Sequence, residues 1–310
     1  MIYHTAAVEA MNPNPFFNEN DTIGIIDVSV ANIRYAPSYE AEMATQAILG
    51  CPVKILEQKR GWYKVQTPEG YSGWTSSPLT ILNKTARNDW ETSPKIIYLP
   101  HFGFSYSKPD DTAQSVSDLV SGAILKLTGS AKSYYCVAYP DGRTAYIPQK
   151  NCMPLEKWKQ SRSLTGKNIV NTALTFMGIP YLWGGTSAKG MDCSGFTKTV
   201  YFLNGVILKR DASQQITAGA VVDTATGFEQ VQPGDLLFFG RKATDSQPEK
   251  IIHVAISLGG AEFIHASGSI RLNSLDPNSP IYDDYNHNRF IRAKRMIGHI
   301  DNVNIWYINY

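Results

Sequence analysis

Two kinds of hydrophobic pattern divide the chain near residue 155. Between residues 22 and 154, short stretches rich in Val, Ile and Tyr alternate with Gly, Pro, Asp and Asn, as in DVSVANIRYAP, AILGCPVKILEQ and GWYKVQTPEGYSGWTSS. The WYKVQT segment alternates apolar and polar residues, as a half-buried strand does, and the PEG and SG segments are turn signals. We therefore expect an all-β N-terminal region.

This all-β region contains an imperfect internal repeat. AILGCPVKILEQKRGWYKVQTPEGYSGW and AILKLTGSAKSYYCVAYPDGRTAYIP share an order: an apolar strand, a turn, an aromatic-led strand, a P-E-G or P-D-G turn and a short aromatic strand. Each copy covers about 60 residues, a length typical of a small β-barrel. We expect an N-terminal segment with a first barrel at residues 1–82 and a second barrel at residues 83–155.

From residue 156 the pattern changes to helices followed by strands. SLTGKNIVNTALTFMGIP has apolar residues at helical spacing before its Gly and Pro stop signals, and further helices are expected after Cys193 and at Asp211. The later segments DLLFFG, IIHVAISL, AEFIHAS and RFIRAKRMIG then predict an antiparallel sheet. Residues 156–310 are therefore expected to form an α+β domain.

Composition and charge exclude several classes of function. The chain has 310 residues and a formal net charge of +2, so it lacks the basic character of a nucleic-acid-binding protein. No apolar window of about 18 residues predicts a membrane-spanning helix. The start, MIYHTAAVEAMNPNPFF, has no basic residues followed by an apolar stretch, so it is not expected to be a signal peptide. The cytoplasm is then expected, or the cell envelope if a signal peptide has been removed.

The four cysteines and six histidines form no metal-binding pattern. No CxxC pair occurs, so we expect neither a zinc site nor another cofactor. Four cysteines are also too few for a scaffold built on disulfides. Cys51, Cys136 and Cys152 are expected to be small, buried, apolar residues.

Cys193 differs from the other cysteines because it directly precedes a predicted helix, in GMDCSGF. The backbone N–H groups and the positive end of the helix dipole favour a thiolate at such a position. We therefore expect the pKa of Cys193 to lie well below the ordinary value of about 8.5. The flanking Gly and Ser allow substrate backbone to approach closely, which makes Cys193 the candidate nucleophile.

Two histidines lie in apolar strands on one predicted β-hairpin. His253 and His265 flank a turn near Gly259–Gly260. With an odd number of residues in the loop, they would face each other directly, about 5 Å apart. One imidazole would then act as the general base, and the other would orient it as the third member of a triad.

These segments together resemble a known family. YLWGGTSAKGMDCSGF, PGDLLFFG, HVAISL and FIHAS are similar to the signature segments of the NlpC/P60 family of papain-like bacterial cell-wall cysteine peptidases. The resemblance covers about residues 160–300 and implies a papain-like α+β catalytic domain. It implies Cys193 as the nucleophile, His253 as the base and His265 as the orienting residue. It also implies an oxyanion hole that includes the backbone N–H of the nucleophile.

The N-terminal region adds a second resemblance. Two bacterial SH3-like barrels, with R-x-x-P at Arg34 and Pro37 and E-G-Y-x-G-W ending at Trp74, are similar to those of γ-D-glutamyl-L-diamino acid endopeptidases, also called dipeptidyl-peptidase VI. The resemblance implies a substrate, L-Ala-γ-D-Glu-diamino acid, derived from peptidoglycan. It implies cleavage after γ-D-Glu in stem peptides whose N-terminal L-Ala is free.

A free α-ammonium group is best recognised by buried carboxylates, because an unpaired buried charge is costly. Asp192 beside the nucleophile and Glu42 in AEMATQ are therefore expected to bind it, with Glu40 as the alternative to Glu42. This chain has R-D-A-S where the family often has R-D-S. Further substrate contacts are expected from two hydroxyls, one barrel tyrosine and two aromatic walls: Ser194, Ser213, Tyr71, Tyr181 and Trp183.

Two alternative functions stay open at this stage. A broader endopeptidase or amidase on intact peptidoglycan would use the barrels as wall-binding modules. A non-catalytic protein that binds cell-wall peptides would need no reactive thiol, so the presence of Cys193, His253 and His265 argues against it. A barrel that closes one end of the cleft would exclude glycan-linked substrates, and the short link at residues 154–164 favours such compact packing.

Overall fold

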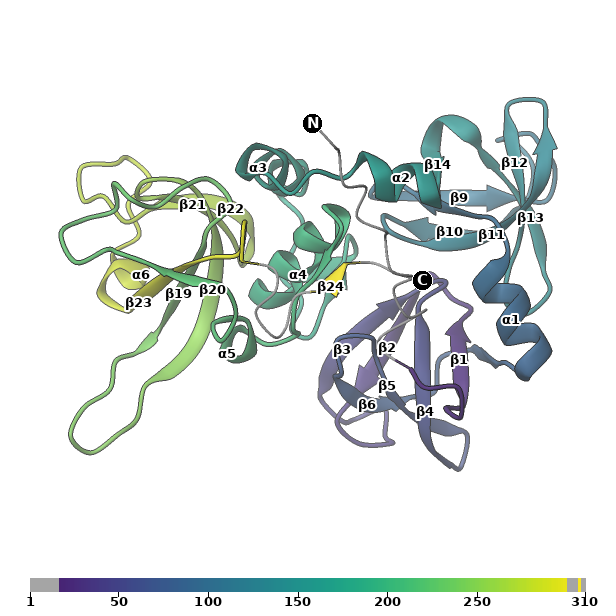
Figure 1. The fold of residues 1–310 in the computed structure, drawn as a ribbon, viewed down its shortest axis with the longest axis horizontal. Helices are drawn as coiled ribbons and strands as arrows, with labels where there is room; N and C mark the ends of the chain where they lie inside the picture. The colour runs from purple at the N-terminus through teal and green to yellow at the C-terminus, as the bar shows by residue number, and fades with distance from the viewer. Residues whose placement is uncertain (1–16, 300–305, 308–310) are drawn as a thin grey trace, which may run out of the picture.

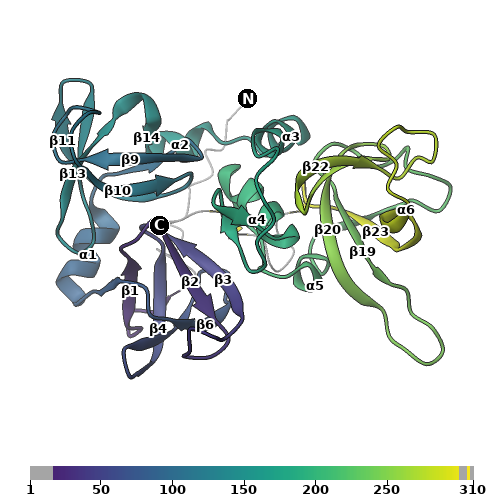
Figure 2. The same cartoon turned by 180° about the vertical axis from the view of Figure 1, so that it is seen from behind.

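The computed structural model describes residues 17–299 and 306–307. Two small β-barrels lie on one side of the molecule and a six-stranded sheet lies on the other, with α4 (Cys193–Leu203) between them (Figures 1 and 2). This arrangement confirms the predicted fold class of an α+β catalytic unit preceded by two small all-β barrels. Within the described residues, no helix is long and apolar enough to cross a membrane.

The first barrel is a seven-stranded antiparallel sheet in the order β3-β2-β6-β5-β4-β1-β7. Alternation along β2 buries Ala31 and Ile33 and exposes Asn32, as expected for a strand with one face in the core. The strands are β1 (Ile23–Ile26), β2 (Val30–Arg34), β3 (Met43–Ile48), β4 (Pro52–Lys59), β5 (Trp62–Gln66), β6 (Ser72–Thr75) and β7 (Leu79–Ile81).

The second barrel repeats the topology of the first. Its strand order, β10-β9-β13-β12-β11-β8-β14, is that of the first barrel shifted by seven strands, and β4 and β11 carry a register shift at the corresponding point. The internal repeat seen in the sequence is therefore structural. The strands are β8 (Lys95–Tyr98), β9 (Phe102–Tyr106), β10 (Ser115–Val120), β11 (Ile124–Ala131), β12 (Tyr134–Ala138), β13 (Thr144–Pro148) and β14 (Cys152–Pro154).

Both barrels are all-β, as predicted, and short helices lie between and beside their strands. Between the barrels, α1 (Lys84–Thr92) begins at Asn83, whose side chain caps the first turn, and it buries Trp90. The short helix η1 (Gln149–Asn151) lies within the second barrel, between β13 and β14, and α2 (Leu155–Ser161) follows that barrel. The boundaries at residues 82/83 and 155/156 stay predictions, and parts of the first and last proposed domains lie outside the described residues.

The C-terminal unit packs helices against one face of its sheet. Apolar residues of α3 (Gly166–Thr175) and α4 meet β19, β20 and β21 in one core. The sheet has the order β18-β23-β19-β20-β21-β22. Its strands are β18 (Ala220–Val222), β19 (Leu236–Arg241), β20 (Lys250–Gly259), β21 (Glu262–Ser267), β22 (Ser269–Ser274) and β23 (Phe290–Arg295). The remaining elements are α5 (Ala212–Gln215), α6 (Asp284–Asn288) and two short strand pairs, β15 (Thr186–Ser187) with β16 (Gly190–Met191) and β17 (Val206–Ile207) with β24 (Trp306–Tyr307).

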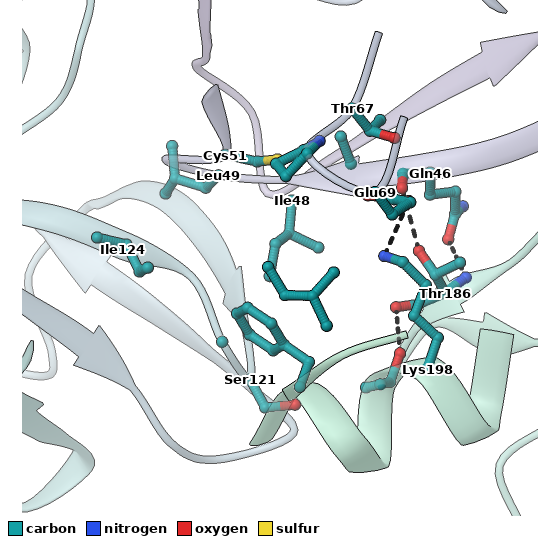
Figure 3. A pocket seen from close by; sticks show the side chains of 16 residues that line it. Gln46, Ile48, Leu49, Cys51, Thr67, Glu69, Ser121, Ile124, Thr186 and Lys198 are labelled. Atoms are coloured by element: carbon teal, nitrogen blue, oxygen red, sulfur yellow. Dashed lines mark hydrogen bonds and ion pairs between the residues drawn. The ribbon is translucent and has the colours of Figure 1, made fainter. Parts of the chain in front are cut away.

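The first barrel docks directly on the C-terminal unit. The side-chain oxygen of Gln46 accepts a hydrogen bond from the backbone N–H of Thr186 at 3.0 Å, and Lys198 of α4 pairs with the buried carboxylate of Glu69 at 3.2 Å (Figure 3). Both contacts border a cavity of about 50 Å³ where the two barrels and α4 meet. The barrel is therefore held against α4 by buried polar contacts.

Glycine at position 50 is required by the junction between the barrels. Gly50 has φ +81°, and a Cβ there would lie 2.0 Å from the backbone oxygen of Ile124. Gly61 has φ +80° and no atom within 4 Å of a Cβ, so it is the matched control. Gly61→Ala is expected to cost about 1–2 kcal/mol through its backbone alone. Gly50→Ala should cost ~1–3 kcal/mol more, because it overpacks the junction.

Differential scanning calorimetry of the two variants measures this difference. Equal losses in Gly50→Ala and Gly61→Ala would mean that the close contact with Ile124 is unimportant for stability.

Candidate active site

Cys193 is the first residue of α4, at the position that the sequence predicts. The preceding Asp192 caps the helix, because its Oδ1 accepts the backbone N–H of Gly195 at 2.7 Å. Position 195 is glycine for a steric reason: a Cβ there would lie 2.0 Å from the backbone oxygen of Gly185. The D-C-S-G segment therefore fixes the start of the helix, and with it the place of the sulfur.

The expectation of a low pKa for Cys193 is wrong. Burial, and to a smaller extent the negative charge of Asp192, raise the pKa of its thiol to about 11. Hydrogen bonds from the backbone of Val254 and Ser194 and the charge of Arg210 act in the opposite direction but do not prevail. At neutral pH the resting thiol keeps its proton, so the reaction needs a base to remove it.

The two predicted histidines form a buried hydrogen-bonded chain. Nε2 of His253 lies 2.8 Å from Nδ1 of His265, and Nε2 of His265 lies 3.1 Å from Oδ1 of Asn273. Asn273 continues the chain by donating from Nδ2 to the backbone oxygen of Ile281. Since Nε2 of His253 is occupied, Nδ1 is the nitrogen left to serve Cys193. The sulfur is hydrogen-bonded to the backbone of Val254, the residue after His253.

The histidines are diagonal neighbours: Gly259 pairs with Glu262, so the loop does not hold the odd number of residues that direct opposition would need. Ile256 pairs with Ile264 across β20 and β21, and one further step would place Ala255 opposite His265. A register shift between Ser257 and Gly259 sets this offset. Diagonal neighbours stay within reach of aromatic side chains, and the two imidazole centroids are 5.0 Å apart.

Burial keeps both imidazoles neutral. It lowers the pKa of His253 well below its ordinary value, and the proximity of His265 and Arg289 acts in the same direction. Burial also lowers the pKa of His265 to about 4, although the hydrogen bond to Asn273 acts in the opposite direction. A neutral imidazole has a free lone pair, so His253 can accept a proton at neutral pH.

Asp192 is paired within the protein, which the sequence did not indicate. Its oxygens accept from Arg210 at 3.1 Å (Nη1) and 2.5 Å (Nη2), and from the backbone N–H of Gly184 at 2.9 Å. Arg210 is 1% exposed, and its Nε donates to Oγ1 of Thr45 in the first barrel at 2.9 Å. In the sequence, only the likeness of the R-D-A-S segment to the family's R-D-S segment pointed to a role for Arg210 in the site.

A cleft of about 320 Å³ opens beside Cys193. The first barrel lines it with Tyr35 and Ala44, and Lys250 is on its rim. Arg210 and Asp211 also line it. Of the residues predicted from the sequence, the cleft brings together Tyr181, Trp183, Asp192, Cys193, Ser194 and Ser213.

Three predicted substrate residues lie elsewhere. Glu42 and its alternative Glu40 are exposed and do not line the cleft. In β3 it is Ala44, two positions after Glu42, that reaches the cleft. Tyr71 does not line the cleft itself, but its hydroxyl lies 3.0 Å from the hydroxyl of Tyr35, which does. Among the described residues, no cluster of three His, Cys, Asp or Glu side chains is arranged to hold a metal ion.

The buried Arg210–Asp192 pair predicts a large loss of stability in Arg210→Ala. Removing one partner leaves an uncompensated buried charge, which costs about 3–5 kcal/mol. Arg292→Ala is the matched control, because the pair of Arg292 with Glu249 is largely exposed and such pairs contribute at most about 1 kcal/mol. Urea unfolding of both variants measures the contrast. Similar small losses would contradict the structural role of Arg210.

The lowered pKa values of the histidines predict a pH-dependent stability. The unfolded chain takes up protons below a pH of about 6.5, whereas the folded His265 stays neutral down to about pH 4. The unfolding free energy should therefore fall as the pH decreases through this interval and level off above it. In His265→Asn, the melting temperature should fall less steeply with pH than in His299→Asn, which leaves the buried pair intact. An unchanged slope would contradict the buried neutral state.

Sequence comparison matches two segments of the chain to known families. Residues 178–295 match the NlpC/P60 family, and residues 33–77 match the bacterial dipeptidyl-peptidase Sh3 domain. The first segment contains Cys193, His253 and His265. The second lies within the first barrel, so the two matches meet at the cleft.

Similar proteins of known name cover most of the chain. Dipeptidyl-peptidase 6 of Lysinibacillus sphaericus is 30% identical over 267 residues, which span 83% of this chain and 93% of that protein. Gamma-D-glutamyl-L-lysine dipeptidyl-peptidase of Bacillus cereus is 30% identical over 250 residues, which span 78% of this chain and 72% of that protein.

The crystal structure of an NlpC/P60 family protein from Bacillus cereus is also similar. It has a TM-score of 0.74 and 26% identity, and the match covers 88% of this chain and 99% of that one. The likeness therefore extends over the barrels as well as the catalytic unit. The predicted family is confirmed: the chain belongs to the NlpC/P60 family and is a cysteine peptidase.

Proposed function

We propose that the protein hydrolyses the bond between γ-D-Glu and the diamino acid in peptidoglycan stem peptides whose N-terminal L-Ala is free. The observation that carries this proposal is the wall that the first barrel contributes to the cleft beside Cys193, through Tyr35 and Ala44. A cleft bounded by a docked barrel has room for a short free peptide and excludes one still linked to glycan. The names of the relatives from Lysinibacillus sphaericus and Bacillus cereus agree with this substrate class.

The proposed reaction is acyl transfer through a thioester. The sulfur of Cys193 attacks the γ-carbonyl carbon while Nδ1 of His253 accepts the thiol proton, because the neutral thiol is a poor nucleophile. The backbone N–H of Cys193 stabilises the developing oxyanion. Collapse of the intermediate breaks the C–N bond, and the leaving amine takes the proton from His253. Water, deprotonated by His253, then hydrolyses the thioester and restores the thiol.

The other buried groups would hold the base in position. His265 fixes the ring of His253 through the bond to Nε2, and Asn273 fixes His265 in turn. This leaves Nδ1 of His253 for proton transfer in both halves of the reaction. Tyr181 and Trp183 line the same cleft and are proposed to hold the peptide against the sulfur.

A broader endopeptidase acting on intact peptidoglycan is the second candidate. It is favoured by the exposed positions of Glu42 and Glu40, which leave the first barrel without the predicted carboxylate in the cleft. In that case the barrels would hold the cell wall and would not select a free amine.

A pair of peptides separates the two candidates. L-Ala-γ-D-Glu-L-Lys should be cleaved after γ-D-Glu, and its N-acetylated form should be cleaved at least about 30-fold more slowly, as expected when one partner of a buried charge pair is lost. Cys193→Ala should lower the rate by several orders of magnitude. Cys136→Ala, in the second barrel, is the matched control and should keep full activity. Product release followed by mass spectrometry measures all of these rates.

Each contrary result has a distinct meaning. Equal cleavage of both peptides would favour the broader endopeptidase. Substantial turnover by Cys193→Ala would contradict the assignment of the nucleophile.

A further inference from the structure

We propose that a groove beside Trp183 binds the side chain of the leaving diamino acid, and that Arg34 of the first barrel recognises a carboxylate at the end of that side chain. This inference rests on the proposed function and deepens it, because it names the diamino acid. The side chain of diaminopimelate ends in such a carboxylate as well as an ammonium group, whereas that of lysine ends in an ammonium group alone. The protein should therefore prefer stem peptides with diaminopimelate after the scissile bond.

The groove adjoins the cleft at the indole of Trp183. It has a volume of about 590 Å³, and it lies between strands β2 and β3 of the first barrel and the segment that precedes Cys193. Trp183 lines both the cleft and the groove and is 60% exposed. A side chain that extends from the sulfur across this indole would enter the groove, with its methylene groups packed on the ring.

The first barrel forms one side of both the cleft and the groove. In β3, Ala44 lines the cleft and Met43 lines the groove, because successive side chains of a strand point to opposite faces. Arg34 is paired with Met43 across β2 and β3, so both lie on the groove side. A Cβ on Gly184 would lie 2.7 Å from the backbone oxygen of Met43. The segment that carries Trp183 is thus packed closely against the strand that separates the two hollows.

Arg34 is the cation that the groove offers to a ligand. Its Nη1 donates to the backbone oxygen of Ala41 at 2.6 Å, which holds the guanidinium in place. In the part of the chain that the structure describes, no carboxylate forms an ion pair with Arg34. Lys189, the other cation of the lining, is bound by Asp118 at 2.5 Å and by Ser29 at 3.0 Å. The planar guanidinium of Arg34 can therefore pair with an incoming carboxylate.

The lining also disfavours a side chain that ends in an ammonium group alone. No Asp or Glu is among the described residues that line the groove. The ε-ammonium of lysine would face Arg34 without a carboxylate to pair with, and like charges repel. Diaminopimelate brings its own carboxylate to this place. Asn32 accepts from Gln46 through Oδ1 at 3.0 Å, which leaves its amide nitrogen as a further donor to that carboxylate.

A matched pair of substrates tests the inference. L-Ala-γ-D-Glu-meso-diaminopimelate and L-Ala-γ-D-Glu-L-Lys differ only by the carboxylate at the end of the side chain, so the ratio of their kcat/KM values isolates its effect. Diaminopimelate should be favoured about 10- to 100-fold, as expected for hydrogen bonds to a charged group. In Arg34→Gln this preference should nearly disappear. Arg34→Lys keeps the charge and loses the planar fork, so it should retain part of the preference.

Two controls separate recognition from structural damage. Arg60→Gln removes the same charge from the exposed β4–β5 turn of the first barrel and should keep the preference. Loss of the bond from Arg34 to Ala41 would by itself lower the melting temperature and slow both peptides equally, whereas loss of recognition slows chiefly the diaminopimelate peptide. Calorimetry with inactive Cys193→Ala protein should show the same preference in binding, and the preference should shrink at high salt.

The possible failures are distinguishable. If neither peptide is cleaved after γ-D-Glu, the proposed function is overturned and this inference with it. If both are cleaved at equal rates, the proposed function stands and the groove does not select the diamino acid. If diaminopimelate is preferred and Arg34→Gln retains the preference, only the assignment of Arg34 is overturned.

Discussion

The buried ion pair between Arg210 and Asp192 is the interaction on which the rest of the site depends. Asp192 caps α4 and receives the backbone N–H of Gly184, while Arg210 reaches Thr45 in the first barrel. One pair of side chains thus joins the nucleophile helix, the loop that precedes it and the docked barrel. Charges buried this deeply are tolerated only when their hydrogen-bonding positions are filled, and here the filled positions define the geometry of the cleft.

The same burial decides the protonation state of the reacting groups. A thiol packed into the core beside the negative charge of Asp192 keeps its proton, and an imidazole in an apolar setting stays neutral. The resting enzyme therefore holds a neutral thiol and a neutral base, so deprotonation belongs to the chemical step. The carboxylate of Asp192 both orders the start of α4 and adds to the effect of burial, which is the main reason why the pKa of Cys193 is raised.

The two barrels share a topology but differ in what they contact. The first reaches the cleft through Tyr35 and Ala44. The second supports the first from behind: Leu49 of the first barrel is buried in the core of the second. Ile124 and Phe202 then connect the second barrel to α4 through a further apolar cluster that includes Trp158. The junction seen in Figure 3 is thus a three-way contact between the two barrels and α4, which supports the cleft wall.

Local patterns in the sequence determined the fold class, the barrel repeat, the helix that starts at Cys193 and the hairpin that carries His253 and His265. These features depend on periodicity, capping and turn residues, which act over a few positions. The tertiary structure alone decided that Arg210 neutralises Asp192, that the histidines meet diagonally, that the thiol pKa is raised, and that Asp211 lines the cleft while Glu42 does not. The physical reason is that burial and charge pairing depend on segments that are distant in the sequence. Asp192 lies beside the nucleophile, and the sequence alone suggests that its carboxylate is free to bind substrate. In the structure, Arg210 from another loop, which is itself bonded to Thr45 of the first barrel, pairs with that carboxylate.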